Sequence, residues 1–458
     1  MADRKAAEQF IETGTKAALD KSSEKNIQHA YQMFTSACYA DPTFDQTWYS
    51  VGNANSDMNL LDAAIACYRR ALECKQSDEN RARTLTNLGW RLHGLGQSQE
   101  ALDVSLEATK LKPDLWPAWV NLSMIWGTIY ETQKGVEAAE RAFKIAPKEC
   151  LTEMALAFAN LFAGNYSKGL MHFERRFEYK LHQFLHYPYG KWLGQKDKTV
   201  FLVADQGLGD TLSYARFLPM AAAKCKFMYI SIQAELMRLF QYSFRHINNI
   251  TFLPMPCNFP AADYWTTFVS LPFAMKMTDE EIKAAGNFDT DTHVAPDTWK
   301  VENRKLHVGI AWSGSPLNEI NGHRSIPIKH FMELAAVPGV QLYSFQVDDA
   351  KRQLHEGGYS PIIRDLSGYI RDVADSMALM RHLDLVVTCE SAVGHIAGAI
   401  AKECIIPYSY LGRDYRLGDR GDRILWYGFH STVQQGPYCR WEPVFETIAA
   451  RLRARVSC

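Results

Sequence analysis

The sequence lacks any long apolar run and any closely spaced cysteine pair. No uninterrupted apolar stretch approaches the roughly 20 residues that a membrane-spanning helix needs. The N-terminal stretch MADRKAAEQFIETG has no apolar core, so it is not typical of a signal peptide. The ten cysteines form no C-x-x-C pair and are scattered through apolar patterns, as reduced buried thiols would be. We therefore expect a cytoplasmic protein without a structural metal.

The sequence also lacks an excess of charge of either sign. Its 458 residues include 50 Lys and Arg and 51 Asp and Glu, for a formal net charge of -1. Without a basic excess, a dedicated nucleic-acid or anionic-membrane surface is not indicated, and a nucleic-acid base is disfavoured as a substrate. Hydrophobic residues make up 47% of the chain, which at this length predicts two or three domains with sizeable cores.

A repeat fills the N-terminal third, from about residue 27 to residue 178. Small residues recur at steps of 34, 37 and 34, and a helix-ending stretch follows each of Ala37, Ala71, Ala108 and Ala142. This period resembles the tetratricopeptide repeat and predicts an α-solenoid over residues 1–182. We expect its concave surface to hold a partner or acceptor; the alternative is that it only scaffolds or dimerises the rest. Candidates for a binding face, although aromatics at this spacing are mostly core, are Trp116, Trp119, Trp126 and Tyr130.

The remaining two-thirds alternates strands and helices, which predicts two doubly wound parallel-sheet halves at residues 183–300 and 301–458. Residues 188–192 are expected to form an irregular linker. In the first half, strands are predicted at 199–204, 227–233 and 250–253, and helices at 210–224 and 234–242. In the second half, strands are predicted at 306–312, 341–345, 384–388 and 404–407, and helices at 328–336, 373–381, 391–401 and 442–455. Two such halves leave a cleft at the carboxyl ends of their strands.

The first candidate site is a glycine turn in the stretch VADQGLGDTLSYARFLP. Gly207 and Gly209 end an apolar strand, and Asp210 opens a helical pattern. Backbone N–H groups point outward at such a corner, but the Asp210 carboxylate would repel a phosphate, and Leu212 replaces the third small residue of a dinucleotide fingerprint. The corner suits a hydroxyl whose proton Asp210 removes. On the residues alone, a helix-capping role for Asp210 is equally weighted.

The second candidate site is the turn in TCESAVGHIAGA. A buried strand ends at Thr388, and Ser391 is a favourable N-cap for a helix rich in small residues. The side chains of Ala392 and Val393 leave the first N–H groups open to a phosphate, and no acid follows inside the helix. Glu390 is placed to accept hydrogen bonds from sugar hydroxyls.

Two further basic or titratable residues belong to the same half. His395 lies one turn after Ser391 on the same helix face, where it could touch a donor; the alternative is a core histidine satisfied by a carbonyl. The loop SGSPLNEINGHRSIP leaves a strand end and carries Arg324, whose guanidinium fork fits phosphate oxygens.

Together, these ordered motifs, with DLSGYIRDVADSMALMRHLDLVVT, resemble the heptosyltransferase-like glycosyltransferases of family 9. The resemblance runs from Leu151 to the C-terminus and is greatest to bacterial proteins that join such a domain to tetratricopeptide repeats. It implies a GT-B fold and an inverting, metal-independent transfer from a nucleotide-diphosphate sugar, with no other cofactor.

The resemblance also implies roles for particular residues. The family's catalytic base corresponds to Asp210, and its basic residue facing the leaving diphosphate to Arg324, where lysine is usual. The acid–hydroxyl pair falls on Glu390 and Ser391, where Asp-Thr is usual, and the closing segment on Tyr415-Arg416…Asp422…Trp426-Tyr427. The residues expected to act in catalysis are Asp210, Arg324 and His395, and those expected to contact the donor are Gly207, Gly209, Ser313, Gly314, Glu390, Ser391, Ala392 and Val393.

The expected function is therefore transfer of a sugar to a hydroxyl of a macromolecule, foremost a protein bound by the repeats. Two alternatives stay open. One is a glycosyltransferase for envelope or lipopolysaccharide-type glycans whose repeats serve assembly, and the other is a non-catalytic repeat scaffold. The nucleotide, sugar, acceptor and any homo-oligomer are not fixed by the sequence.

Overall fold

The computed structural model describes residues 2–19, 24–178, 187–284, 303–316, 321–410, 414–417, 426–428, 430–436 and 438–457. The chain divides into two compact units, Met1–Ala159 and Asn160–Cys458. The domain boundaries expected between residues 182 and 183 and between residues 300 and 301 lie outside the described residues.

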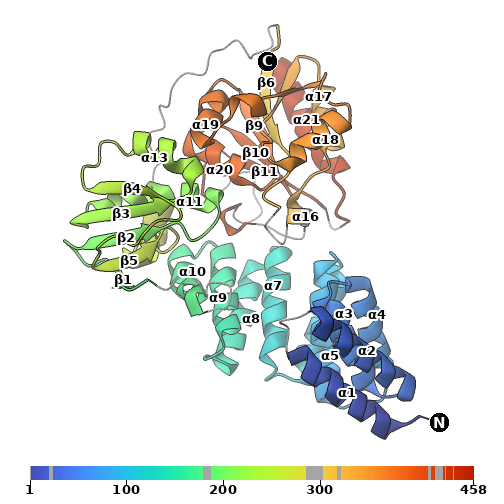
Figure 1. Ribbon diagram of the computed structural model, residues 1–458. Helices are drawn as coiled ribbons and strands as arrows, with labels where there is room; N and C mark the ends of the chain where they lie inside the picture. The colour runs from blue at the N-terminus through green and yellow to red at the C-terminus, as the bar shows by residue number, and fades with distance from the viewer. Residues whose placement is uncertain are drawn as a thin grey trace. The chain divides into compact units, whose positions relative to one another are not determined.

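The first unit is a stack of antiparallel helix pairs (Figure 1). Its helices are α1 (Arg4–Leu19), α2 (Glu24–Ala40), α3 (Asp45–Asp57), α4 (Leu61–Glu73), α5 (Asp78–Gly94), α6 (Ser98–Leu111), α7 (Trp116–Thr128), α8 (Thr132–Ile145) and α9 (Cys150–Phe162), which runs past the unit's end. The predicted repeat array is confirmed. It begins earlier than the pattern indicated, because α1 pairs with α2 ahead of residue 27.

Small residues hold the repeats together. The four alanines that defined the period, Ala37, Ala71, Ala108 and Ala142, are all fully buried. Glycine plays the same part on the partner helix, since a Cβ at Gly52 would lie 2.6 Å from the Tyr68 ring. Backbones can therefore approach closely, and each pair buries its apolar face against the next.

Two of the aromatic residues suggested for a binding face have structural roles. Trp119 donates its indole N–H to the Pro113 carbonyl at 3.0 Å, as Trp48 does to Pro42 at 2.8 Å, so both tie a helix to the preceding loop. Tyr130 is buried, which makes its assignment to an exposed face wrong.

The second unit begins with α10 (Tyr166–Phe173) and a 3-10 helix, Glu174–Glu178, and continues with a parallel five-stranded sheet in the order β1-β5-β2-β3-β4. Its strands are β1 (Gly190–Lys191), β2 (Thr199–Val203), β3 (Phe227–Ile232), β4 (Ile250–Pro254) and β5 (Tyr264–Thr267). The linker expected at 188–192 was wrong in part, because Gly190 and Lys191 pair with β5 at the sheet edge.

The helices of this half are shorter than the sequence pattern predicted. The expected helix 210–224 is divided into α11 (Leu208–Tyr214), a 3-10 turn at Ala215–Phe217 and α12 (Leu218–Ala222). Pro219 lies in the first turn of α12, where its missing N–H costs nothing, and it cannot continue a preceding helix. The remaining helices are α13 (Met237–Ser243), α14 (Leu271–Ala274) and α15 (Asp279–Ala284).

A second parallel sheet follows, in the order β11-β10-β9-β6-β7-β8. Its strands are β6 (Leu306–Ala311), β7 (Val340–Ser344), β8 (Ile363–Asp365), β9 (Leu385–Thr388), β10 (Cys404–Tyr408) and β11 (His430–Gln434). Its helices are α16 (Asn321–Arg324), α17 (Met332–Ala335), α18 (Arg352–Glu356), α19 (Val373–Arg381), α20 (Ala392–Ala399) and α21 (Glu442–Ser457).

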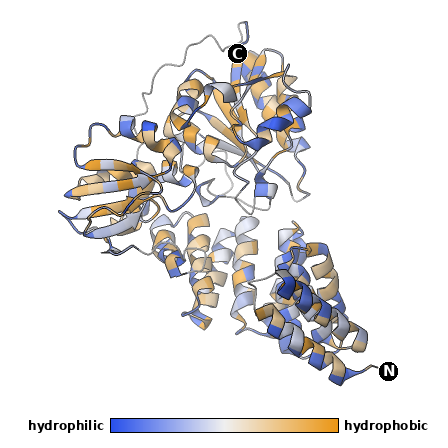
Figure 2. Cartoon of the chain, viewed as in Figure 1, coloured by the Kyte–Doolittle hydropathy of each residue, from blue (hydrophilic) through white to orange (hydrophobic). Residues whose placement is uncertain are grey.

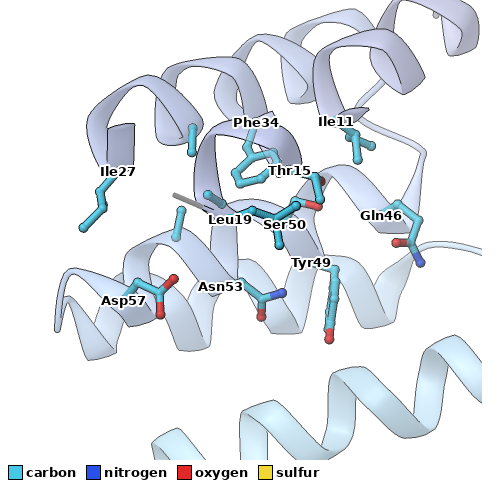
Figure 3. A pocket seen from close by; sticks show the side chains of 13 residues that line it. Ile11, Thr15, Leu19, Ile27, Phe34, Gln46, Tyr49, Ser50, Asn53 and Asp57 are labelled. Carbon is cyan, nitrogen blue, oxygen red and sulfur yellow. The ribbon is translucent and has the colours of Figure 1, made fainter. Parts of the chain in front are cut away.

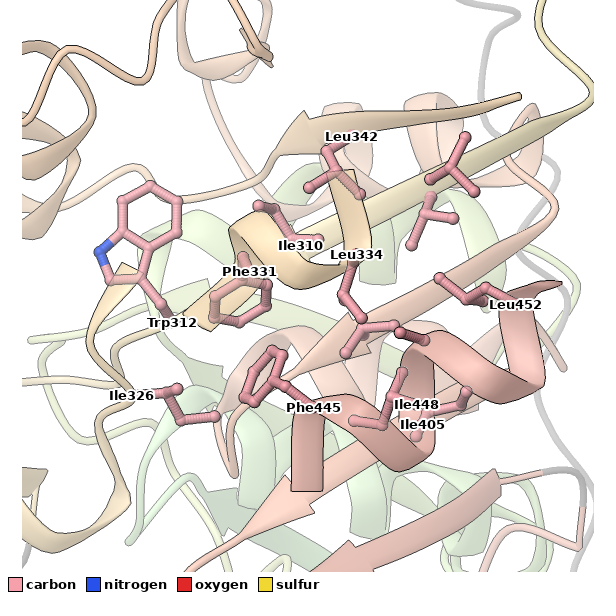
Figure 4. Close-up of a cluster of buried hydrophobic side chains, with 14 of the residues drawn as sticks. Ile310, Trp312, Ile326, Phe331, Leu334, Leu342, Ile405, Phe445, Ile448 and Leu452 are labelled. Carbon is pink, nitrogen blue, oxygen red and sulfur yellow. The ribbon is translucent and has the colours of Figure 1, made fainter. Parts of the chain in front are cut away.

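The core of the second half lies between one face of this sheet and α17 and α21. Phe331 and Phe445 meet edge to face with ring centroids 4.8 Å apart, and Ile310 and Leu342 supply the sheet side (Figure 4). The strands β6 and β9 are mainly apolar and almost completely buried. In Figure 2 the strands of this sheet are largely orange, whereas the helices around them mix orange and blue. The two parallel sheets predicted from the sequence are thus confirmed.

Candidate functional site

Each sheet has a point at which its strand order reverses, and both candidate turns lie at such points. In the first sheet β2 stands between β3 and β5, and the Gly207 turn follows β2. In the second sheet β6 stands between β7 and β9, so the loops after β6 and β9 flank its reversal. Ligands of open parallel sheets bind outside the carboxyl ends of strands at this location.

Asp210 is the third residue of α11. Gly207 occupies the N-cap position, so the alternative that Asp210 caps the helix is wrong. The Asp210 side chain retains 28% of its exposure and forms an ion pair with Arg416, with Oδ1 2.9 Å from Nη1. The carboxylate is accessible, but it is already paired with the Arg416 guanidinium.

The two turns face each other within the second unit. A Cβ on Gly209 would lie 2.5 Å from the His395 ring and 3.4 Å from the Ala392 Cα, so only glycine permits this approach of α11 to α20. The structure therefore brings Asp210, on the same turn as Gly209, to the side of the α20 N-terminus. It also gives Gly209 a packing role; contact between Gly207 or Gly209 and a donor stays a prediction.

The start of α20 is open in the way the sequence predicted. Ser391 is at the N-cap position, but its side chain makes no capping hydrogen bond and instead lies 3.1 Å from the Thr388 hydroxyl. Among the described residues, no acceptor is found for the backbone N–H groups of Ala392 and Val393. These are the donors that stabilise an anion at a helix N-terminus.

Glu390 and Arg324 are brought together beside this helix start. Arg324 donates from Nε and Nη2 to the Glu390 backbone carbonyl at 3.1 and 2.7 Å, and its Nε lies 3.2 Å from the Glu390 carboxylate. Glu390 Oε2 accepts the Asp414 N–H at 3.1 Å. Glu390 is therefore not directed freely at a ligand, and the Glu390 and Asp414 carboxyls both border the turn.

The two carboxyl groups have opposite pKa shifts. Burial raises the pKa of Glu390 above its ordinary value, and the Arg324 charge only partly opposes this. Burial would also raise the pKa of Asp414, but the charge and hydrogen bonds of Arg416 outweigh it and lower the pKa. Asp414 is thus the fixed negative charge of the pair.

Ser313 and Gly314 lie in the loop after β6, next to Glu390. A Cβ on Gly314 would be 3.7 Å from the Glu390 carbonyl oxygen. Their backbone N–H groups are already used, since Ser313 donates to Gln346 and Gly314 to Asn321. The loop therefore borders the site through its shape and side chains.

A small cavity marks the centre of the arrangement. It has a volume of about 20 Å³, room for one water molecule, and is lined by Glu390, Ser391, Gly394, His395, Ile406, Asp414, Arg416, Tyr427 and His430. Burial lowers the pKa of His395 well below its ordinary value, so the ring is neutral, and its Nδ1 lies 3.2 Å from the Tyr427 hydroxyl.

Sequence reasoning did not single out Asp414, and it gave Arg416 only the role implied by the family resemblance, a place in the closing segment that shapes the donor pocket. The contact of Arg416 with Asp210 joins positions far apart in the chain. The aromatic residues of that segment are also used, because the Tyr415 and Tyr214 hydroxyls lie 2.6 Å apart and Trp426 packs on Tyr214. Asp422 lies outside the described residues.

The first unit has a separate cavity of about 360 Å³ between α1, α2 and α3. Its lining is mixed, with apolar side chains such as Ile11, Ile27 and Phe34 and the polar side chains of Asn53 and Tyr49 on α3 (Figure 3). The Tyr49 side chain also borders a neighbouring hollow of about 300 Å³ with Asn87 and Trp116. The repeat face thus carries two adjoining hollows with mixed apolar and amide linings.

Metal and membrane features were searched over the described ranges alone. These ranges contain no group of three or more His, Cys, Asp or Glu side chains that could hold a metal ion. None of the helices in them is both long enough and apolar enough to span a bilayer.

Comparisons with known proteins match one of the repeats to a family and most of the chain to a relative. Residues 45–78 match the tetratricopeptide repeat family. Protein FlbA of Caulobacter vibrioides is 24% identical over 436 residues, which cover 87% of this chain and 71% of that protein.

Among solved structures, MamA 41-end from Desulfovibrio magneticus RS-1 is 17% identical, covering 40% of this chain and 99% of that one with a TM-score of 0.33. YrrB, a repeat protein titled as having an unusual peptide-binding site, is 17% identical over 40% of this chain and 95% of its own, with a TM-score of 0.30.

Proposed function

We propose that the chain is an inverting, metal-independent glycosyltransferase of GT-B architecture. It would move a sugar from a nucleotide-diphosphate donor to a hydroxyl of a macromolecule. One observation carries the proposal: an acidic turn at the reversal point of one sheet faces an uncapped helix start at the reversal point of the other. A base and an anion site on opposite walls are what a displacement at a sugar phosphate requires.

The donor's diphosphate would lie against the backbone N–H groups of Ala392 and Val393, beside Arg324. The Arg324 guanidinium is held by the Glu390 carbonyl, which fixes its position before a ligand arrives. These donors oppose the charge that grows on the leaving group, and removing one such interaction typically costs about 3 kcal/mol in the transition state.

The reaction would be a single displacement. The acceptor oxygen attacks the anomeric carbon, the bond from that carbon to the diphosphate oxygen breaks, and its electron pair leaves with the nucleoside diphosphate. Asp210 takes the proton of the acceptor hydroxyl. A carboxylate on the acceptor wall and none inside the first turn of α20 give the two substrates opposite electrostatic preferences.

The cavity must open before a donor can bind. Its volume of about 20 Å³ is far below the few hundred Å³ of a typical ligand site. Arg238 joins α13 to Asp372, the N-cap residue of α19, with Nε–Oδ2 2.7 Å apart, and so holds the two sheets of the unit together. We infer that this arrangement is a closed state of the proposed enzyme, and closure of this kind limits donor hydrolysis by water.

The repeats would present the acceptor. Tetratricopeptide repeats generally mediate protein interactions, and the first unit offers two adjoining hollows around Tyr49. We therefore propose a protein as the acceptor or as the partner that delivers it.

Binding and turnover test the proposal separately. A thermal-shift panel of ADP-, UDP-, GDP-, CMP- and dTDP-linked sugars should raise the melting temperature with one nucleotide class, because a ligand that binds only the folded state stabilises it. The Asp210→Asn variant should retain that shift and lose sugar transfer by about 100-fold or more. Unchanged transfer by Asp210→Asn would reject Asp210 as the base.

A further inference from the structure

The Arg416 side chain contacts Asp210, the residue proposed as the catalytic base. Its guanidinium is buried and makes contacts along two edges. Nε and Nη2 both bond to Asp414, a two-pronged grip, while Nη1 lies 2.9 Å from Asp210 Oδ1 and 2.7 Å from the Ser213 hydroxyl. One edge is therefore fixed by Asp414 and the other is shared between α11 and the cavity.

The Asp210 contact is incompatible with catalysis. Asp210 Oδ1 lies 2.9 Å from the Arg416 guanidinium, so the space beside that oxygen is already filled by a hydrogen-bond donor and not by an acceptor hydroxyl. For Asp210 to act as a base, Arg416 must give up this contact.

The same residue borders the space where an anion would sit. Arg416 lines the cavity together with Ser391, the N-cap residue of α20, and Gly394 and His395 of that helix. A diphosphate placed there would offer Nη1 an acceptor with more negative charge than a single carboxylate. Asp414 would keep hold of the other edge, so the exchange needs only a small movement of the guanidinium.

We propose that Arg416 exchanges partners: without a ligand it neutralises Asp210, and with a nucleoside diphosphate in the cavity its Nη1 bonds to the diphosphate. Donor binding thereby releases Asp210 to accept the proton of the hydroxyl. The base is active only when a donor is present, which protects the empty site from unproductive chemistry. The inference rests on the proposed function and adds Arg416 to the residues that touch the donor.

The test is a double-mutant cycle on ligand affinity, measured by isothermal titration calorimetry on the full chain. The probes are ADP, UDP, GDP and dTDP, and the cycle uses the one that binds the wild type most tightly. Arg416→Gln should weaken binding about 10- to 100-fold, the usual worth of a hydrogen bond between charged groups. Asp210→Asn should tighten binding about threefold or more, because the competitor for Nη1 is gone.

The cycle separates partner exchange from simple repulsion. In the Arg416→Gln background, Asp210→Asn should no longer tighten binding, since no guanidinium remains to be released. Equal tightening in both backgrounds would mean that Asp210 merely repels the diphosphate, which overturns the exchange. Arg453→Gln is the matched control, because Arg453 of α21 forms an exposed ion pair with Glu333 of α17, and it should leave affinity within about twofold.

The outcomes also distinguish this inference from the proposed function. If no nucleoside diphosphate binds the wild type, the proposed function and the exchange both fail. If one binds and Arg416→Gln has wild-type affinity, the exchange alone fails. Should Arg416→Gln not fold, unchanged or weaker binding by Asp210→Asn still overturns the exchange, because removal of the competitor for Nη1 must tighten binding.

Discussion

Replacing Arg176 should destabilise the second unit, because its side chain is the buried support under the Gly207–Asp210 turn. Arg176 lies in the 3-10 helix after α10 and is 1% exposed. It donates from Nη2 to Asp205 Oδ2 at 3.0 Å, and Asp205 lies two residues after the end of β2. It also contacts the hydroxyls of Thr267 and Ser270 at 2.9 and 2.8 Å.

The expected loss of stability follows from the buried Asp205 carboxylate, which Arg176→Gln would leave without its partner. The Asp205 side chain is fully buried, and its Oδ1 has no hydrogen-bond partner among the described residues. Without the guanidinium, the carboxylate would be an unpaired buried charge, and breaking such a pair typically costs about 3–5 kcal/mol. At roughly 2 °C or more per kcal/mol for a unit of this size, the melting temperature should fall by about 6–10 °C.

The pH dependence of the loss has a definite sign. Burial raises the pKa of Asp205, and removing Arg176 removes the charge that opposes this. An acid whose pKa is raised in the folded state contributes fully to stability below its unfolded pKa and loses that contribution as pH rises through the folded value. The deficit of Arg176→Gln should therefore be larger at pH 8 than at pH 5.

Urea denaturation of the full chain, followed by tryptophan fluorescence, measures the loss. Arg175→Gln is the matched control, because Arg175 is the adjacent residue and pairs with the exposed Glu178; we expect a change within about 0.5 kcal/mol. Adding Asp205→Asn to Arg176→Gln should recover part of the stability. A single Arg176→Gln variant as stable as the wild type would refute the reasoning.

Two further predictions concern the repeats and the site. Gly52→Ala should destabilise the first unit by about 1–2 kcal/mol in urea denaturation, because overpacking against Tyr68 exceeds the gain in helix propensity. The control Gly94→Ala should be neutral or stabilising by up to about 1 kcal/mol, because its Cβ would lie 3.7 Å from the nearest atom. Equal stability of the two variants would contradict this prediction. Because burial raises the pKa of Glu390, its contribution to stability is complete below the unfolded value and is lost as pH rises above it. The melting temperature of Glu390→Gln, relative to that of the wild type, should therefore be higher at pH 8 than at pH 5. A difference of the opposite sign would contradict a raised pKa for Glu390.

The sequence predicted the repeats well because their determinants are local and periodic. Ala71 and Ala108 recur where helices cross, and each is fully buried. The long central strands were also found, since a parallel strand buried on both faces is a continuous apolar run, as in β2. Short strands were missed because two or three residues at a sheet edge, such as Gly190–Lys191, depend on a distant partner and have no pattern of their own.

The site was predicted in outline for a similar reason. The Gly207 turn and the Ser391 turn each have a local signature, a strand, a small residue and a helix start. The ion pairs between them do not, because Arg416 reaches Asp210 only through the fold. The Glu390 carboxyl was expected to face a sugar, but its contacts with Arg324 and Asp414 are set by loops whose conformation no spacing encodes.

The most direct test of the central claim is a crystal structure of the chain with the nucleoside diphosphate that stabilises it most. We expect diphosphate density against the backbone N–H groups of Ala392 and Val393, within hydrogen-bonding distance of Arg324 and with Asp210 across the cavity. Density for the diphosphate on the Gly207–Asp210 side, or at a site away from α20, would contradict it.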